Sequence, residues 1–304
     1  MRKSLALILS AGLLLSLAAC SGSPAGPDCS AMPASGDSSN AVSVTGDIGA
    51  KSVTASFPSP LVANKTEATV LVTDDEGTAA GPGGTVDVVY SIFDGDTGTE
   101  VGQAKSGLVA LSESLPEGLR NTLACTGPGE RVAVVLPNDI GTQIDPDATG
   151  SVVMVFDVVT AYPQAANGSD QPAASGFPSV VHDENGRPGV LINGEAPTEA
   201  KSTLLKKGDG PVVAEGDALL VQRMDVSYTT KKVDTANSTW ETGTPQLWLA
   251  SDDTTKTQGS KQPPQIAEYL IGQTIGSEVL VVIPDSSGSA TAYVIDLLGI
   301  VTQP

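Results

Sequence analysis

The feature that most constrains this chain is that its second half repeats its first. The stretch GDGPVVAEGDALLVQ at residues 208–222 aligns without gaps with EGTAAGPGGTVDVV at residues 76–89, and the alignment superposes Gly77 on Gly210. In both copies a turn rich in glycine leads directly into a run of apolar residues, which is typical of a turn followed by a buried strand. We therefore predict that one structural module occurs twice.

Two further blocks continue the repeat in the same order, and their spacing changes only across predicted loops. A chain of 304 residues is long enough for two domains that each bury a core of their own. The matched blocks are GERVAVVLP (129–137) with GSEVLVVIP (276–284), and VFDVV (155–159) with VIDLL (294–298).

The N-terminus has the features of a bacterial lipoprotein signal. Arg2 and Lys3 precede an apolar run over residues 5–17, and Leu17-Ala18-Ala19-Cys20 resembles a lipobox. The run is shorter than the roughly 20 residues that a membrane-spanning helix needs. We expect residues 1–19 to be removed and Cys20 to be lipidated, which would anchor the protein on the outer side of the bacterial cell membrane; plain secretion is the alternative.

The chain is strongly acidic, with a formal net charge of −19. Because binding to phosphate depends on Lys and Arg, this charge argues against nucleic acid as a partner and against electrostatic binding to anionic lipids. Attachment to the membrane would then depend on the lipid at Cys20. Residues 20–40 contain almost no large apolar side chains, and we predict a flexible tether there.

Two cysteines remain besides Cys20, and their state stays open. Cys29 lies in the predicted tether and Cys125 in the first domain. In an extracytoplasmic compartment they can form a disulfide, and two free thiols are the alternative.

The remainder of the chain alternates short β-branched runs with turns of Gly, Asp and Asn. One helix is expected among the strands of the first half, because Ser114 and Glu117 have the spacing of a capping box and Leu115, Leu119 and Leu123 recur at helical spacing. The segment at 163–175 (PQAANGSDQPAAS) interrupts the pattern, so we predict domains at residues 41–162 and 176–304 with a linker between them.

The repeated blocks resemble the FKBP-type peptidyl-prolyl cis-trans isomerases. GDGPVVAEGDALLVQ, KKVDT, IGQTIGSEVLVVIP and AYVIDLLG occur in the order of that family over about residues 201–301, and the first half is similar in a more diverged form. The resemblance implies an α+β fold of two FKBP-like domains, each an antiparallel sheet wrapped around a short helix. It also implies an apolar pocket for a proline and the residue before it.

The activity implied by the resemblance is isomerisation of X–Pro bonds in secreted polypeptides as they fold. Rotation about such a bond crosses a barrier of about 18–20 kcal/mol that arises from amide resonance. A dry pocket that favours the twisted amide lowers this barrier, so the reaction needs no nucleophile, metal or cofactor, and we expect none.

The resemblance also marks the residues at the pocket of the second domain, where several family aromatics are replaced. Arg223 stands in place of a tyrosine, Val233 of a phenylalanine and Ile266 of a tryptophan. Asp234 matches the family's aspartate, and Trp248 and Tyr293 remain as aromatic wall. Because a charge on the inner face of a strand is costly unless paired, we expect Arg223 to form an ion pair with Asp234 or else to reach solvent.

The first domain has lost a complementary set of pocket residues. Tyr90 matches the family's tyrosine, but Val101 stands where the family has phenylalanine, Leu119 replaces the tryptophan, and Ile140 lies near the place of a second tyrosine. Each domain thus keeps one member of the family's Tyr/Asp pair. We take the second domain as the better candidate for activity and a catalytically inactive binding or chaperone-like scaffold as the alternative.

Other classes of function find little support in the residues. The single histidine, His182, lies in a turn-rich segment and is expected on the surface, which argues against a Ser-His-Asp hydrolase and a histidine-rich metal site. The acidic segments FDGDTGTE (93–100) and DPDATG (145–150) lack the glutamate of an EF-hand loop, so hairpin turns are expected there. The scattered aromatics could form a carbohydrate-binding platform, and the predicted anchor also fits a solute-binding lipoprotein. Both hypotheses are weaker than the isomerase.

Overall fold

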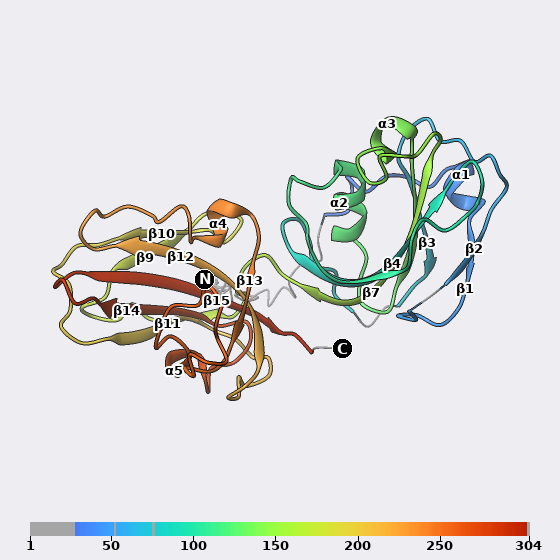
Figure 1. The fold of residues 1–304 in the computed structure, drawn as a ribbon. Helices are drawn as coiled ribbons and strands as arrows, with labels where there is room; N and C mark the ends of the chain where they lie inside the picture. The colour runs from blue at the N-terminus through green and yellow to red at the C-terminus, as the bar shows by residue number, and fades with distance from the viewer. Residues whose placement is uncertain (1–27, 52, 75–76, 303–304) are drawn as a thin grey trace, which may run out of the picture.

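The computed structural model describes residues 28–51, 53–74 and 77–302, and two antiparallel sheets dominate it (Figure 1). The first half forms a five-stranded sheet in the order β3-β6-β7-β4-β5, and the second a six-stranded sheet in the order β8-β11-β14-β15-β12-β13. The first sheet consists of β3 (Glu67–Val72), β4 (Thr85–Asp94), β5 (Lys105–Ala110), β6 (Arg131–Leu136) and β7 (Val152–Tyr162). The second consists of β8 (Ser169–Asp170), β11 (Lys201–Lys207), β12 (Ala218–Ser227), β13 (Gln246–Leu249), β14 (Glu278–Pro284) and β15 (Ala290–Ile300).

The repeat in the sequence is also a repeat of topology. The order β3-β6-β7-β4-β5 corresponds strand for strand to β11-β14-β15-β12-β13, and β8 is an additional edge strand. The register shifts at the same aligned place in both sheets, between Asp87 and Val88 of β4 and between Leu220 and Val221 of β12. A bulge at one aligned position in two sheets is a conserved feature of one module rather than a local accident.

Each sheet curves around a helix on its inner face (Figure 1). In the first half α2 (Glu117–Ala124) packs Leu119 and Leu123 against apolar residues of β4, β6 and β7. In the second half α5 (Ala267–Leu270) is a single turn, which packs Leu270 against β12 and β14. The predicted α+β arrangement is therefore present in both halves, although the second helix is much shorter.

The expected capping box at the start of α2 is wrong. The helix begins at Glu117, and the residue before it, Pro116, has extended backbone angles and makes no capping hydrogen bond through its side chain. The hydroxyl of Ser114 pairs with that of Ser112 instead of an N–H of the helix. Proline at this place fixes the entry of the chain into the helix without a capping side chain.

A hairpin and its flanking residues cover the outer face of each sheet. In the first half this cover contains α1 (Asp37–Asn40), β1 (Ser43–Thr45) and β2 (Thr54–Ser56), and it packs on β6 and β7. In the second half β9 (Ser179–His182) and β10 (Pro188–Leu191) lie over β12, β14 and β15. The remaining helices, α3 (Asn138–Gly141) and α4 (Thr239–Thr242), are single turns.

Parts of the predicted tether and linker belong to the folded structure. Residues 28–40 are described, with α1 held because the Glu67 carboxylate accepts hydrogen bonds from the N–H groups of Ser38 (2.9 Å) and Ser39 (3.0 Å). Cys29 and Cys125 form a disulfide; of the two states that the sequence left open, the structure has the bridge and not the free thiols. In the predicted linker, β8 pairs with β11 and Ala166 is buried.

The predicted signal peptide and the lipidated Cys20 lie outside the described residues. Within the part of the chain that the structure describes, no helix has the length and apolar character to cross a bilayer.

The two halves touch through a small apolar cluster. Tyr162, at the end of β7, packs with Leu220 of β12 and Leu298 of β15, and Leu108 of β5 lies at its margin. Gly299 permits this contact, because a Cβ atom there would lie 2.3 Å from the Tyr162 ring.

Candidate functional site

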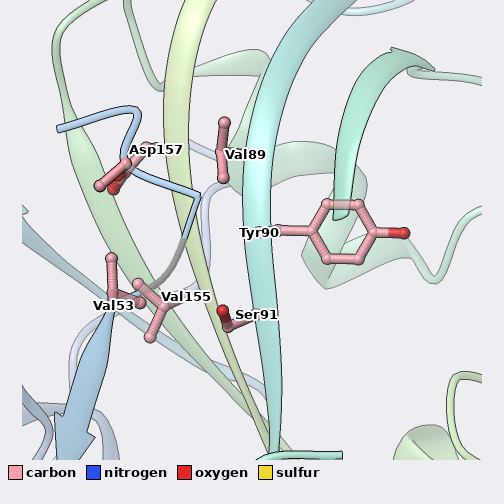
Figure 2. Close-up of a pocket in the computed structure, with 7 residues that line it drawn as sticks. Val53, Val89, Tyr90, Ser91, Val155 and Asp157 are labelled. Carbon is pink, nitrogen blue, oxygen red and sulfur yellow. The ribbon is translucent and has the colours of Figure 1, made fainter. Parts of the chain in front are cut away.

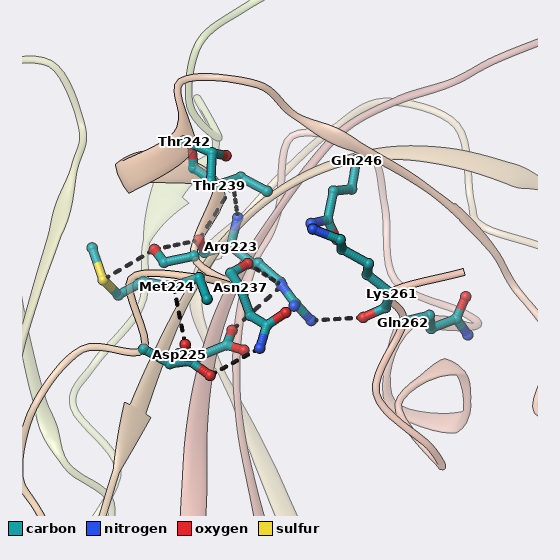
Figure 3. Close-up of polar contacts among 12 residues, drawn as sticks. Arg223, Met224, Asp225, Asn237, Thr239, Thr242, Gln246, Lys261 and Gln262 are labelled. Carbon is teal, nitrogen blue, oxygen red and sulfur yellow. Dashed lines mark hydrogen bonds and ion pairs between the residues drawn. The ribbon is translucent and has the colours of Figure 1, made fainter. Parts of the chain in front are cut away.

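In the second half the guanidinium of Arg223 fills the place of the expected pocket. Its side chain, only 2% exposed, lies on the inner face of β12 between Trp248 and two loops. Nε donates to the carbonyl of Asn237 (2.8 Å) and Nη1 to the carbonyl of Lys261 (3.1 Å), as Figure 3 shows. The guanidinium also lies 5.3 Å from the centre of the Trp248 ring, a cation–π contact. Arg223 is thus held from several sides.

The ion pair of Arg223 is formed with Asp225, so the expected pair with Asp234 is wrong. Nε of Arg223 lies 3.5 Å from Oδ1 of Asp225, two residues along the same strand and on the same face. Burial raises the pKa of Asp225 to about 6, even though the neighbouring guanidinium acts in the opposite direction. The charge of Arg223 thus partly offsets the cost of burying this carboxylate.

Asp234 instead points to its own loop. Its carboxylate accepts hydrogen bonds from Asn237 Nδ2 (2.9 Å) and from the N–H of Ala236 (3.1 Å). The hydrogen bond from Asn237 is the largest cause of its lowered pKa, and Arg223 adds a smaller effect. An exposed carboxylate that closes a turn is a structural element of that loop.

The other residues predicted for this pocket are divided between the two faces of the sheet. Trp248 and Ile266, 1% and 0% exposed, pack with the half-buried Tyr293 in the core on the inner face. Val233 packs in the core on the outer face, with Met224 and Trp240. The structure therefore brings together Arg223, Trp248, Ile266 and Tyr293, but as a closed core with no aromatic pocket left open between them.

In the first half the four predicted residues share one apolar cluster and leave it partly open. Leu119 is buried in the core, while Tyr90, Val101 and Ile140 are half-buried and pack on it. The Tyr90 ring stacks on Phe156 with 5.4 Å between ring centres. Part of the Tyr90, Val101 and Ile140 side chains therefore stays exposed at the edge of this cluster.

A shallow hollow on the outer face of the first sheet does not serve as a site. Figure 2 shows Val89, Ser91, Val155 and Asp157 lining it, while Tyr90 turns to the opposite side of its strand. The hollow encloses no space that a water molecule could occupy.

Sequence reasoning missed a pair of buried polar groups at equivalent positions of the two sheets. In the first half Arg131 and Asp157 form a bidentate ion pair (2.6 and 2.7 Å), and Arg131 also donates to the carbonyls of Gly46 and Asp47 in the outer cover. In the second half the aligned residues are Glu278 and Asp296. The aligned blocks GERVAVVLP and GSEVLVVIP contained the signal, because they superpose Arg131 on Glu278.

The histidine that was expected on the surface is exposed, as predicted, but it lies on a strand and contacts this buried pair. His182 lies on β9, and its Nε2 is 2.8 Å from Oε1 of Glu278. Glu278 and Asp296 are fully buried neighbours across β14 and β15, and burial raises their pKa values to about 7 and about 8. Burial also lowers the pKa of His182. Among the described residues no cluster of His, Cys, Asp and Glu has the composition to hold a metal ion.

Comparisons with known proteins find similarity only at the level of structure. No family model matches the sequence, and no curated protein is similar to it. The solved structures that resemble the chain include FKBP-type proteins, and their TM-scores are low. The three FKBP domains of wheat FKBP73 match over 78% of this chain and 95% of theirs, with 14% identity and a TM-score of 0.32.

Single-domain neighbours match over a smaller share of the chain. FKBP12 from Mycobacterium tuberculosis covers 34% of this chain and 86% of its own, with 19% identity and a TM-score of 0.26. A peptidyl-prolyl cis-trans isomerase from Pseudomonas syringae covers 33% of this chain and 77% of its own, with 22% identity and a TM-score of 0.26.

Proposed function

We propose that this chain is an FKBP-type peptidyl-prolyl isomerase made of two FKBP-like domains, with its working pocket on the inner face of the first sheet. The observation that carries the proposal is a contrast between the halves: Tyr90, Val101 and Ile140 are half-buried at the edge of an apolar cluster, while the second half has the buried Arg223 beside Trp248 on the matching face. The repeated strand order and the FKBP-like sequence blocks support the assignment to this class. The second half then serves as a closed, non-catalytic copy.

The chemistry follows from an apolar surface with one polar handle. A prolyl ring packed on Leu119, Val101 and Ile140 loses its hydrating water. The twisted amide, whose resonance is reduced, is thereby stabilised relative to the planar amide, and the barrier to rotation falls. The Tyr90 hydroxyl can donate a hydrogen bond to a substrate carbonyl at the rim. No step requires a metal, a cofactor or a covalent intermediate.

The location is proposed from the N-terminal residues. A lipidated Cys20 anchors the protein outside the bacterial cell membrane, where secreted polypeptides with proline-containing segments fold. The disulfide between Cys29 and Cys125 supports an oxidising compartment, because such bridges are rare in the cytosol.

The test is acceleration of a refolding reaction limited by proline isomerisation, using the full mature chain. Ile140→Asp places a charge on the proposed prolyl surface and should reduce the catalysed rate at least tenfold. Val181→Asp is the matched control, since Val181 is 69% exposed on the other half, and it should leave the rate unchanged. If the folded wild-type protein gives no acceleration, the proposed activity is wrong.

A second candidate function is a non-catalytic, chaperone-like scaffold. The specific observation in its favour is that Arg223 is bonded to two loop carbonyls within the second half and Asp234 is engaged in its own turn. A scaffold predicts that the full chain binds unfolded polypeptides without changing the isomerisation rate, whereas the first proposal predicts that both occur.

A further inference from the structure

A composite groove runs between the two halves. Its larger part is a cleft of about 690 Å³ that Leu111, Ser112 and Arg120 line from the first half and Gln222, Trp240 and Thr242 from the second. A smaller hollow of about 250 Å³ adjoins it, because Thr244 lines both. We call the two together the inter-sheet groove.

Three buried polar atoms at the inter-sheet groove have no hydrogen-bond partner among the described residues. They are the side-chain oxygens of Thr85 and Gln222 and the indole N–H of Trp240, and their residues are 2%, 3% and 9% exposed. Thr85 lines the smaller hollow, and Gln222 and Trp240 line the cleft. Buried polar groups are rarely left unsatisfied, so such a concentration along one groove points to a ligand that supplies the missing partners.

The missing partners have the pattern of a peptide group. The indole of Trp240 only donates, so it requires a carbonyl, while the Gln222 oxygen only accepts and requires an N–H. Uncharged hydroxyl and amide side chains, among them Ser112, Asn121 and Thr242, line much of the cleft. The Trp240 ring is buried and offers no stacking face to a sugar, which favours a polypeptide over a carbohydrate.

The smaller hollow supplies an apolar subsite. Its apolar lining comes from both halves and consists of Leu108, Ala110, Leu220, Pro245 and Leu247. Leu247 is half-exposed, which leaves apolar surface that an incoming side chain can cover. A hollow of this size accepts one aliphatic or aromatic side chain.

A free strand edge lies beside the same groove. β5 pairs only with β4 and is the last strand of the five-stranded sheet. The corresponding edge strand of the other sheet, β13, is already engaged, since Gln262 Oε1 accepts from the N–H of Leu249 at 3.1 Å. The edge of β5 is thus the one suited to pair with an added extended chain.

We propose that the inter-sheet groove binds an extended segment of a polypeptide, with main-chain groups at Gln222 and Trp240 and one apolar side chain in the hollow beside Leu108. Small movements of the lining side chains bring the buried polar atoms to the bound main chain. The site does not require proline, so it adds a binding function to the isomerase proposed above and holds a client chain without depending on the Tyr90 surface.

The experiment uses the full mature chain and fluorescein-labelled synthetic peptides that contain no proline and one central leucine, with binding followed by fluorescence anisotropy. A peptide with serine in place of the leucine tests the apolar subsite. Trp240→Phe removes the donor and keeps the ring, Gln222→Leu removes the acceptor, and Leu108→Asp charges the hollow. Ile140→Asp, on the proposed prolyl surface, is the matched control.

The expected result is saturable binding that weakens at least fivefold for the serine peptide and for each of the three groove variants, but not for Ile140→Asp. Circular dichroism and thermal unfolding establish that each variant is folded. Binding that Ile140→Asp alone abolishes, or that none of the groove variants changes, overturns the proposal. Binding of neutral oligosaccharides in place of peptides also overturns it. Because the peptides lack proline, loss of isomerase activity and loss of groove binding are separate outcomes.

Discussion

At the scale of single residues, Arg223 determines how the inner face of the second half is packed. A buried arginine must find partners inside the fold. It finds them in Asp225, two loop carbonyls and the face of Trp248. A charge that is bonded in this way closes the pocket more firmly than a bulky apolar residue would, because its removal leaves other polar groups unsatisfied.

Arg223→Ala should therefore destabilise the protein strongly, even though it removes an apparent obstruction. It leaves Asp225 buried without its cation and opens a cavity beside Trp248, so the free energy of unfolding at pH 7 should fall by about 3 kcal/mol. Arg223→Leu combined with Asp225→Asn should recover much of this loss. Urea unfolding provides the measurement, and Arg187→Ala is the control, since its exposed ion pair with Glu241 should contribute less than about 1 kcal/mol.

At the scale of elements, each sheet contacts its outer hairpin through a buried pair of polar residues, and the two pairs occupy aligned positions. The first pair joins a base to an acid, whereas the second joins two acids. Arg131 and Asp157 neutralise each other in the first half, and Gly49 donates to the same Asp157 carboxylate (2.8 Å). In the second half Glu278 and Asp296 are two acids side by side, with one oxygen of each unpartnered among the described residues. Lys206 of β11, His182 of β9 and Asp170 of β8 surround them. This pair must keep protons to remain buried.

The stability of the second half should consequently decrease as the pH rises from about 5 to about 8. The folded pKa values of Glu278 and Asp296 are raised to about 7 and about 8, so the folded state holds protons that the unfolded state has lost. The lowered pKa of His182 acts in the opposite direction, removing stability as the pH falls below its ordinary value, whereas the raised pKa of Asp225 acts in the same direction as the acid pair. Asp296→Asn should flatten the profile and raise the thermal midpoint at pH 8. An unchanged profile in this variant would show that the acid pair is not responsible.

The elements themselves were predictable, whereas the state of the site was not. Strands such as β6 and β14 follow from local β-branched runs, and the repeat placed them in equivalent positions. The sequence pattern predicted a flexible tether where the structure has the helix α1. This helix depends on Glu67, which is distant in the sequence, and on a disulfide that the sequence left open. The closed pocket was missed because the partners of Arg223 include Lys261, in a loop without a counterpart in the aligned blocks.

At the scale of the whole molecule, the disulfide ties the start of the described chain to the end of α2. Cys29 and Cys125 are separated by 96 residues, which include β3, β4 and β5. Opening a loop of this length should lower the stability of the first half by about 2–5 kcal/mol, because the unfolded chain regains freedom. Cys29→Ser with Cys125→Ser should show this in calorimetry. The wild-type protein in reductant should behave like the double variant, while the same reductant should leave the double variant unchanged.

The contact between the two halves should couple their thermal unfolding. Tyr162 packs so closely on Gly299 that a methyl group there must push the ring away, since a Cβ would lie 2.3 Å from it. Gly299→Ala should loosen the cluster of Tyr162, Leu220 and Leu298, so that the two halves unfold at more widely separated temperatures in calorimetry. Gly194→Ala is the control, because nothing lies within 4 Å of a Cβ at that position. Since the inter-sheet groove is lined from both halves, the Gly299 variant should also bind the leucine peptide more weakly while its isomerase rate stays the same.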